Sequence, residues 1–339
     1  MGTPTSDFSY ELPAAAIAQE PLEPRDASRL LDADDLSDHT FSDLPNLLSP
    51  GDVVVVNRTR VRNARLLGTK VVGGGRVEAL LLRPISGDLW QAVVRPSRRL
   101  RPGSDLDFGA IKATITAISP QGTVEISLQA EGDLEEAIAA TGTVPLPPYI
   151  REQPGDPERY QTIFARSVGS AAAPTAGLHF TPRLVEALRA RSVDVVDIEL
   201  KIGLDTFRPI SAVHIEDHQI HSESLTIPTE TADAINDRRG ALVAVGTTVV
   251  RSLESRTESD GRVVPGSVDT RLYITPGYRF QVVDRLITNF HLPETSLIVL
   301  VAAFMGHRWR HAYETALGRG YRFASFGDAM IASRKDEAS

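Results

Sequence analysis

The stretch ALVAVGTTVVRSLESRTE, residues 241–258, decides the fold class of this chain. Its first five residues, Ala241–Val245, are all apolar, which predicts a short strand that is buried on both faces. Gly246 interrupts the apolar run, and Val249–Glu258 then repeats apolar residues at helical spacing. A buried strand that leads directly into a helix is typical of an α/β domain.

The alternation of strands and helices continues on both sides of this stretch. Upstream, Val53–Val56 follows Pro50 and Gly51 and predicts another buried strand. Downstream, Thr181 and Pro182 are typical of a helix start, since threonine caps the first turn and proline fits its first position. The predicted helices are Pro182–Arg191, Thr229–Arg239, Ser296–Met305 and His307–Leu317, and the predicted strands are Val193–Leu200, Arg271–Thr275 and Val282–Thr288. These elements indicate a large α/β domain that includes the N-terminal 60 residues.

A different pattern fills the segment from Ala64 to Leu128. Short strands alternate there with turns such as Gly73–Gly75 and Arg101–Gly103. The predicted strands are Arg65–Val72, Val77–Arg83, Trp90–Arg95, Ile111–Ile118 and Val124–Leu128. This spacing predicts a small all-β barrel or sandwich that is inserted into the α/β domain and ends at the rigid segment Pro145–Pro148.

Length and composition limit the function classes. The chain has 339 residues, which fits two domains, and 42% of them are hydrophobic. The absence of cysteine excludes disulfides, thiolate metal sites and cysteine nucleophiles. The longest apolar run, Leu297–Met305, is far shorter than the roughly 20 residues that a membrane span needs. The N-terminus also lacks the basic and apolar regions of a secretory signal, so we expect a cytoplasmic protein without a membrane partner.

Charge is distributed unevenly along the chain. The net charge is −8, yet residues 51–101 contain eleven arginines and lysines and only three acidic residues. This basic patch, which runs from Arg58 to Arg101, indicates that a polyanion docks at one place on an acidic protein. The alternative interpretation is that some of these arginines pair with acidic residues elsewhere in the chain.

Three of the eight histidines lie close together, at His214, His218 and His221, with Glu223 just downstream. Imidazoles and a carboxylate suit a zinc or iron site. They equally suit general acid–base chemistry, because imidazole titrates near neutral pH. A polar surface loop is the third interpretation.

Polar residues also follow several predicted strands. Gly246, Thr247 and Thr248 stand between a buried strand and a helix, where free N–H groups and hydroxyls can bind a carboxylate or a phosphate, although simple capping is an alternative role. Small residues at 171–180 surround His179, and the segment 289–293 closes another strand. Polar strand ends in one α/β domain indicate a shared cleft.

These segments resemble one family, the S-adenosylmethionine:tRNA ribosyltransferase-isomerases of queuosine biosynthesis. The resemblance covers the chain from end to end. The matching motifs include Tyr10–Pro13, Ser28–Leu31, Thr59–Val61, Pro145–Ile150, Ala172–Phe180, His218 with His221 and Glu223, Val245–Thr248, Thr288–Pro293 and Gly327–Met330. So many motifs in one order identify the chain as a member of this family.

The resemblance implies a fold and a reaction. The implied fold is a barrel-like α/β catalytic domain, residues 1–62 and 149–339, with a small antiparallel β-barrel domain inserted at residues 63–148. The implied substrates are S-adenosylmethionine, which donates its ribosyl moiety, and a tRNA that carries 7-aminomethyl-7-deazaguanine at the wobble position. The implied product is epoxyqueuosine in tRNA, with release of adenine and methionine. No cofactor and no metal are expected, and the protein is expected to be a monomer or a homodimer.

The resemblance also selects candidate site residues. A base must remove the 5′ proton that the sulfonium acidifies, whereas the aminomethyl group of the tRNA base is itself the nucleophile. The candidate catalytic residues are His179, His221, Glu223 and His291. The candidate substrate-binding residues are Asn57, Arg60, Pro174, Thr175, Gly177, His218, Gly246, Thr247, Thr248, Arg251, Glu254 and Asn289.

The chain departs from the family pattern at a few positions. Lys201 and Asp205 stand where relatives usually have histidine and glycine, and a Lys–Asp pair there would narrow a cleft. These departures motivate an alternative function, a paralogue that uses S-adenosylmethionine with a different acceptor. A non-catalytic tRNA-binding protein and a metal hydrolase built on the clustered histidines are further alternatives.

Overall fold

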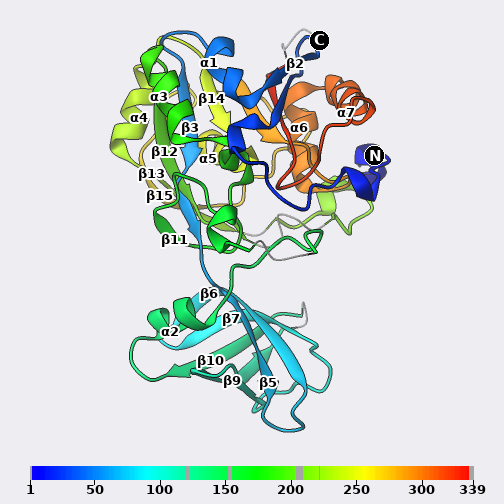
Figure 1. Cartoon of the computed structure of the whole chain (residues 1–339), viewed down its shortest axis with the longest axis vertical. Helices are drawn as coiled ribbons and strands as arrows, with labels where there is room; N and C mark the ends of the chain where they lie inside the picture. The colour runs from blue at the N-terminus through cyan, green and yellow to red at the C-terminus, as the bar shows by residue number, and fades with distance from the viewer. Residues whose placement is uncertain (1, 120–121, 152–154, 204–208, 221, 336–339) are drawn as a thin grey trace. The chain divides into compact units, whose positions relative to one another are not determined.

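The computed structural model describes residues 2–119, 122–151, 155–203, 209–220 and 222–335. The chain forms two compact units (Figure 1). The first, which we call the α/β unit, contains residues 1–59, 147–167 and 173–339. The second, the barrel unit, contains residues 60–146 and 168–172.

A nine-stranded mixed sheet forms the centre of the α/β unit. In spatial order its strands are β15 (Gly266–Thr270), β13 (Glu223–Ile227), β12 (Asp194–Leu200), β3 (Val53–Asn57), β14 (Leu242–Val245), β16 (Arg285–Asn289), β17 (Ala329–Ser333), β1 (Arg29–Asp32) and β2 (Ser37–Thr40). The neighbours β12, β3, β14 and β16 are parallel, so their carboxyl ends lie at one edge of the sheet. In an open α/β sheet this edge is where ligands bind.

Burial explains why the two central parallel strands, β3 and β14, are short and mostly apolar. Every residue of β3 and β14 is buried, so neither strand shows the alternation of a half-exposed strand. The α-helices of the unit are α1 (Leu44–Leu47), α3 (Pro182–Ala190), α4 (Thr229–Asn236), α5 (Thr247–Ser255), α6 (Ser296–Met305) and α7 (Arg308–Gly318). The short 3₁₀ helices are η1 (Thr5–Phe8), η2 (Ala14–Ala16), η3 (Arg25–Ala27), η4 (Phe41–Asp43), η5 (Pro157–Tyr160), η6 (Thr175–His179) and η8 (Ile215–Asp217).

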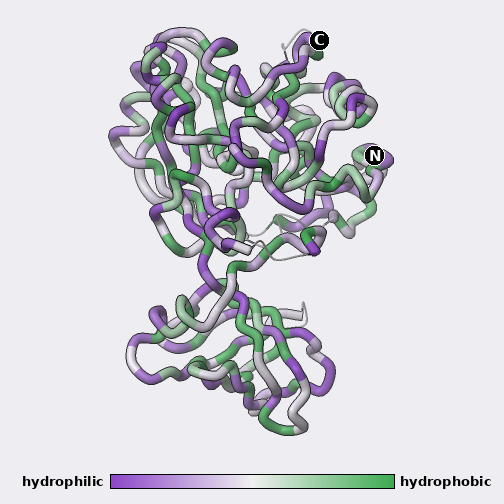
Figure 2. Tube along the Cα trace, viewed as in Figure 1, coloured by the Kyte–Doolittle hydropathy of each residue, from purple (hydrophilic) through white to green (hydrophobic). Residues whose placement is uncertain are grey.

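The barrel unit is a closed antiparallel barrel of six strands. They are β5 (Arg65–Lys70), β6 (Arg76–Ser86), β7 (Leu89–Arg95), β8 (Asp105–Asp107), β9 (Ile111–Ile118) and β10 (Val124–Ala130), followed by α2 (Leu134–Thr141). Hydrophobic and hydrophilic residues alternate along these strands, as Figure 2 shows, and the inward residues, Trp90 and Ile115 among them, form a separate core. Strands β4 (Thr59–Val61) and β11 (Ser167–Ser170) pair in a small two-stranded sheet.

The structure confirms the predicted fold class, an α/β fold with an inserted antiparallel β-barrel. The predicted strand at Arg271–Thr275 is wrong, because the edge strand β15 lies directly before it and pairs with β13. Most of β15 is exposed, so it has no hydrophobic pattern that predicts it. Within the described residues, no helix combines the length and the apolar character that crossing a membrane requires.

Candidate active site

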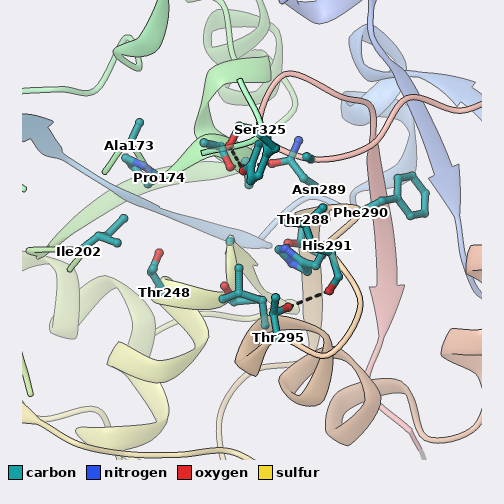
Figure 3. Close-up of a pocket in the computed structure, with 18 residues that line it drawn as sticks. Ala173, Pro174, Ile202, Thr248, Thr288, Asn289, Phe290, His291, Thr295 and Ser325 are labelled. Atoms are coloured by element: carbon teal, nitrogen blue, oxygen red, sulfur yellow. Dashed lines mark hydrogen bonds between the residues drawn. The ribbon is translucent and has the colours of Figure 1, made fainter. Parts of the chain in front are cut away.

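A pocket lies at the carboxyl ends of β14 and β16 in the α/β unit (Figure 3). Three segments build most of its wall: residues 173–176, which lead into η6, residues 246–248 at the start of α5, and residues 288–292 at the end of β16. Its lining residues are Tyr149, Ala173, Pro174, Thr175, Ala176, Ile202, Gly246, Thr247, Thr248, Thr288, Asn289, Phe290, His291, Leu292, Thr295, Leu297, Ala324 and Ser325. The strand-end segments that suggested a shared cleft therefore meet in one pocket.

The pocket lining is polar but uncharged. Among the described residues that line it, there is no aspartate, glutamate, lysine or arginine. Hydroxyl groups, one amide and one imidazole supply its polar atoms. A charged ligand in this pocket must therefore be stabilised by hydroxyls and by backbone dipoles.

His291 is the histidine that faces the pocket. Its Nε2 lies 2.8 Å from the Thr288 hydroxyl oxygen, and its main chain is fixed because its N–H donates to the Tyr313 hydroxyl and its carbonyl accepts from Tyr10. The other ring nitrogen, Nδ1, has no hydrogen-bond partner among the described residues. Figure 3 shows the imidazole beside Thr288, facing the side of the pocket where Thr248 lies. One ring nitrogen is therefore available to a ligand.

His179 lies behind the pocket wall and is fully engaged. Its Nδ1 is 2.7 Å from Ser28 Oγ, its Nε2 is 3.0 Å from Asn289 Nδ2, and its ring stacks on Phe41. The Asn289 Oδ1 accepts a 3.1 Å hydrogen bond from the Thr175 hydroxyl. Since the Asn289 amide donates to Nε2, the proton of the neutral imidazole is on Nδ1 and points to Ser28. His179 thus fixes Asn289 and Thr175, which line the pocket.

Both imidazoles are neutral near physiological pH. Burial lowers the pKa of His179 from 6.5 to about 4 and the pKa of His291 to about 3. In the unfolded chain both groups titrate near 6.5. Folding therefore releases protons below that pH, and acid destabilises the fold.

We expect the free energy of unfolding to fall as the pH decreases from 7 toward 5. Each histidine contributes a slope of at most about 1.4 kcal/mol per pH unit, because the unfolded chain binds protons that the buried imidazoles do not. Urea unfolding at pH 7.5, 6 and 5 measures this slope. His179→Gln should reduce it, whereas replacement of the exposed His311 by alanine should leave it unchanged. A free energy of unfolding that does not change between pH 7.5 and 5 would contradict the claim that both histidines are buried in the neutral form.

The start of α5 presents polar groups to the pocket. Gly246 has a φ of 91°, a conformation that favours glycine, and α5 begins at the next residue. Thr247 and Thr248 line the pocket. Neither threonine caps the helix, because the N-cap position is occupied by Gly246, which has no side chain to accept a capping hydrogen bond.

Glu223 and Arg251 form a buried ion pair. Arg251 Nη1 lies 2.6 Å from Glu223 Oε2, and the second carboxylate oxygen accepts a 2.9 Å hydrogen bond from the Gly203 N–H. Arg251 also donates from Nε to the Leu272 carbonyl. The carboxylate therefore holds Gly203, the neighbour of the pocket residue Ile202, in place.

Other candidate residues lie away from the pocket lining. Glu254 accepts hydrogen bonds from the backbone N–H groups of residues 281–283, and the Asn57 amide bonds Thr59 and Leu200. His218 packs edge-on against Tyr273, Gly177 is buried in η6, and Arg60 lies in β4. His221 and Asp205 lie outside the described residues, so the roles predicted for them stay predictions. Lys201 forms an ion pair with Glu199, at 3.7 Å.

Several pocket residues were not among the candidates. The Tyr149 and Ser325 hydroxyl groups are hydrogen-bonded at 2.7 Å, and both residues line the pocket. The other lining residues that were not candidates include Thr288, Thr295 and Ile202. Thr288 is the first residue of the family motif Thr288–Pro293, so the resemblance could have identified it as a candidate site residue. Hydroxyl and aliphatic side chains occur throughout a protein, so the sequence alone does not distinguish those that line a pocket.

Eight of the ten arginines of the basic patch fall into two groups. Arg58, Arg62 and Arg65 are ion-paired, with Asp197, Glu135 and Glu78 respectively. Five others are exposed and have neither an ion pair nor a side-chain hydrogen bond among the described residues; we call them the barrel cations. They are Arg76, Arg95, Arg98, Arg99 and Arg101. The alternative that some patch arginines pair with acidic residues elsewhere in the chain is therefore correct for Arg58 and Arg62, whereas Arg65 pairs within the patch.

The described histidines and carboxylates do not converge on a metal site. In the part of the chain that the structure describes, no group of three or more such side chains is placed to hold a metal ion. His214 instead lies 3.7 Å from Asp217.

Comparison with known proteins gives the family. The family model described as "Queuosine biosynthesis protein" matches residues 5–332. The S-adenosylmethionine:tRNA ribosyltransferase-isomerase of Moorella thermoacetica is 49% identical over 96% of this chain and 98% of its own length, and that of Symbiobacterium thermophilum is 48% identical over the same shares. The crystal structure of S-adenosylmethionine tRNA ribosyltransferase from Thermotoga maritima matches with a TM-score of 0.53 and 33% identity, over 96% of this chain and all of that chain. This chain therefore belongs to the queuosine biosynthesis protein family.

Proposed function

We propose that this chain is an S-adenosylmethionine:tRNA ribosyltransferase-isomerase. It transfers and isomerises the ribosyl moiety of S-adenosylmethionine onto 7-aminomethyl-7-deazaguanine at the tRNA wobble position, which gives epoxyqueuosine in tRNA and releases adenine and methionine. The observation that carries the proposal is the convergence of three family segments, residues 173–176, 246–248 and 288–292, on one uncharged pocket. Similarity over nearly the whole length of named relatives supports it.

The uncharged pocket suits the first chemical step. The positive charge of the sulfonium in S-adenosylmethionine acidifies the neighbouring 5′ C–H. A nearby carboxylate would weaken this effect by neutralising the charge, and the described lining has none. A protein nucleophile is not needed, because the aminomethyl nitrogen of the tRNA base attacks the ribosyl group.

His291 is the residue that we propose to accept the 5′ proton. Its Nε2–H then donates to the Thr288 hydroxyl, which leaves the lone pair on Nδ1 directed to the ligand. The low pKa keeps the imidazole unprotonated near neutral pH, as a general base must be. A positioned base of this kind contributes about a hundred- to ten-thousand-fold to the rate.

His179 acts differently in this proposal, as a positioning residue. Both of its ring nitrogens are engaged by protein groups, so neither can exchange a proton with a substrate in the pocket. It holds the Asn289 amide in one orientation, and Asn289 in turn directs the Thr175 hydroxyl. Thr175 and Asn289 then contact the substrate.

Glu223 is proposed as a second positioning residue, through the ion pair with Arg251. Glu223→Gln leaves the Arg251 guanidinium buried without its counter-charge, which costs about 3–5 kcal/mol of stability. The double variant Glu223→Gln with Arg251→Gln should lose less, because it leaves no unpaired charge. Thermal unfolding compares the two. A single variant as stable as the native protein would show that the pair is not structural.

The barrel cations are the proposed contact for the tRNA backbone. Arg95 and Glu78 are register partners on β7 and β6, and the Lys70 ammonium donates to the Arg98 carbonyl, so the β5–β6 turn and the loop after β7 lie together at one end of the barrel. Exposed guanidinium groups without partners suit phosphate groups. The ion-paired arginines Arg58, Arg62 and Arg65 are excluded from this role.

Adenine release tests the proposed function. The purified protein is incubated with S-adenosylmethionine and either tRNA that carries 7-aminomethyl-7-deazaguanine or the same tRNA with unmodified guanine. We expect adenine and methionine in equal amounts with the first tRNA and neither with the second. Release with a small-molecule acceptor but not with modified tRNA would favour the paralogue instead.

A further inference from the structure

The N-terminus of α5 contains a hydroxyl that no protein group satisfies. Only 7% of Thr248 is exposed, and its Oγ1 has no hydrogen-bond partner among the described residues. A buried hydroxyl without a partner costs about 1–3 kcal/mol, so a bound water or a ligand that satisfies it stabilises the protein. Figure 3 shows this hydroxyl directed into the pocket, toward the space between Ile202 and His291.

Two backbone donors lie beside this hydroxyl. The N–H groups of Thr247 and Thr248 are the first two of α5, a helix of nine residues, and neither has an acceptor among the described residues. The positive end of the helix dipole lies at the same place. These two N–H groups and the Thr248 hydroxyl form a cradle directly after Gly246, whose φ of 91° favours glycine at this position.

We infer that this cradle binds the carboxylate of the methionine moiety of S-adenosylmethionine, an inference that rests on the proposed function. Two N–H groups and one hydroxyl match the two oxygens of a carboxylate. Since the described lining has no lysine or arginine, the start of α5 is its strongest source of positive potential. The ribosyl moiety then extends from α5 toward His291, where the 5′ proton is removed.

The test pairs one protein group with one ligand group. Titration calorimetry measures the dissociation constants of S-adenosylmethionine and of decarboxylated S-adenosylmethionine with the native protein, Thr248→Val and Thr248→Ser. Thr248→Val should weaken S-adenosylmethionine about 10- to 100-fold, because it removes one hydrogen bond to a charged group, and should leave the decarboxylated ligand unchanged. Thr248→Ser, which keeps the hydroxyl, should bind both ligands like the native protein.

Controls separate this inference from the proposed function. Thr257, whose hydroxyl bonds the Leu253 carbonyl just beyond the other end of α5, is the matched position, and Thr257→Val should leave both dissociation constants unchanged. Equal weakening of both ligands by Thr248→Val, or no weakening, would overturn the carboxylate assignment alone. Loss of affinity for a tRNA anticodon stem–loop without loss for S-adenosylmethionine would assign the cradle to a phosphate and also overturn it. A native protein that binds no S-adenosylmethionine would overturn the proposed function as well.

Discussion

Replacement of His291 by glutamine should lower the turnover number about 10²- to 10⁴-fold, while the dissociation constant for S-adenosylmethionine changes little. The amide retains a partner for the Thr288 hydroxyl but cannot accept a proton from carbon. Single-turnover release of adenine with modified tRNA measures the effect. The pH dependence should also be informative: because the pKa of His291 is about 3, its titration should not appear in the rate profile between pH 5 and 8.

A matched variant separates proton transfer from pocket structure. His179→Gln alters a histidine that is buried in the same region but has no free ring nitrogen. It should lower thermal stability more and turnover less than His291→Gln does. If His291→Gln keeps full turnover, the proton acceptor is a different residue, with His221 as the remaining candidate from the sequence.

Charge reversal at Arg98 and Arg99 should weaken tRNA binding strongly and flatten its salt dependence. Each lost phosphate contact lowers the slope of log K against log salt concentration by about 0.7 to 0.9, so the double variant should lose about 1.5. The affinity for S-adenosylmethionine should stay unchanged, since the pocket that we propose for it lies in the α/β unit. Filter binding of tRNA at several salt concentrations measures both quantities.

The control for this variant carries the same change in net charge. Arg189 and Arg191 are exposed near the C-terminal end of α3, at the opposite end of β12 from the pocket, because β12 begins just after them. Arg189→Glu with Arg191→Glu should bind tRNA like the native protein. Equal loss in both double variants would attribute the effect to overall charge rather than to the barrel cations.

The strongly apolar elements of the fold were predictable from the sequence. Helix α6 and strand β9 have the predicted bounds, since each is long and has a consistent pattern. The edge strand β15 and the three-residue strand β8 were not predicted, because an exposed or very short strand leaves no periodic pattern. Their positions depend on pairing with distant strands, which single-sequence periodicity does not contain.

The candidate site was predictable where polar residues follow buried strands. Gly246–Thr248, Asn289 and His291 all line the pocket, as residues at strand ends on one edge of a sheet should, and Thr175 at the start of η6 joins them. Glu254 shows the limit of this prediction, because its carboxylate lies nearly two turns along α5 from Thr248 and accepts hydrogen bonds from backbone N–H groups instead of facing a ligand. Which residues pair with one another, such as Glu223 with Arg251, depends on the tertiary fold.

The central claim is that the ribosyl moiety, not the methyl group, of S-adenosylmethionine reaches the tRNA. It is tested most directly with two preparations of S-adenosylmethionine, one labelled with carbon-14 in the ribose and one labelled in the methyl group. Each is incubated with the native protein and modified tRNA, and the label in tRNA is counted after precipitation. We predict that ribose label enters the tRNA and that methyl label leaves with methionine. Methyl label in the tRNA, with S-adenosylhomocysteine as the second product, would contradict the account.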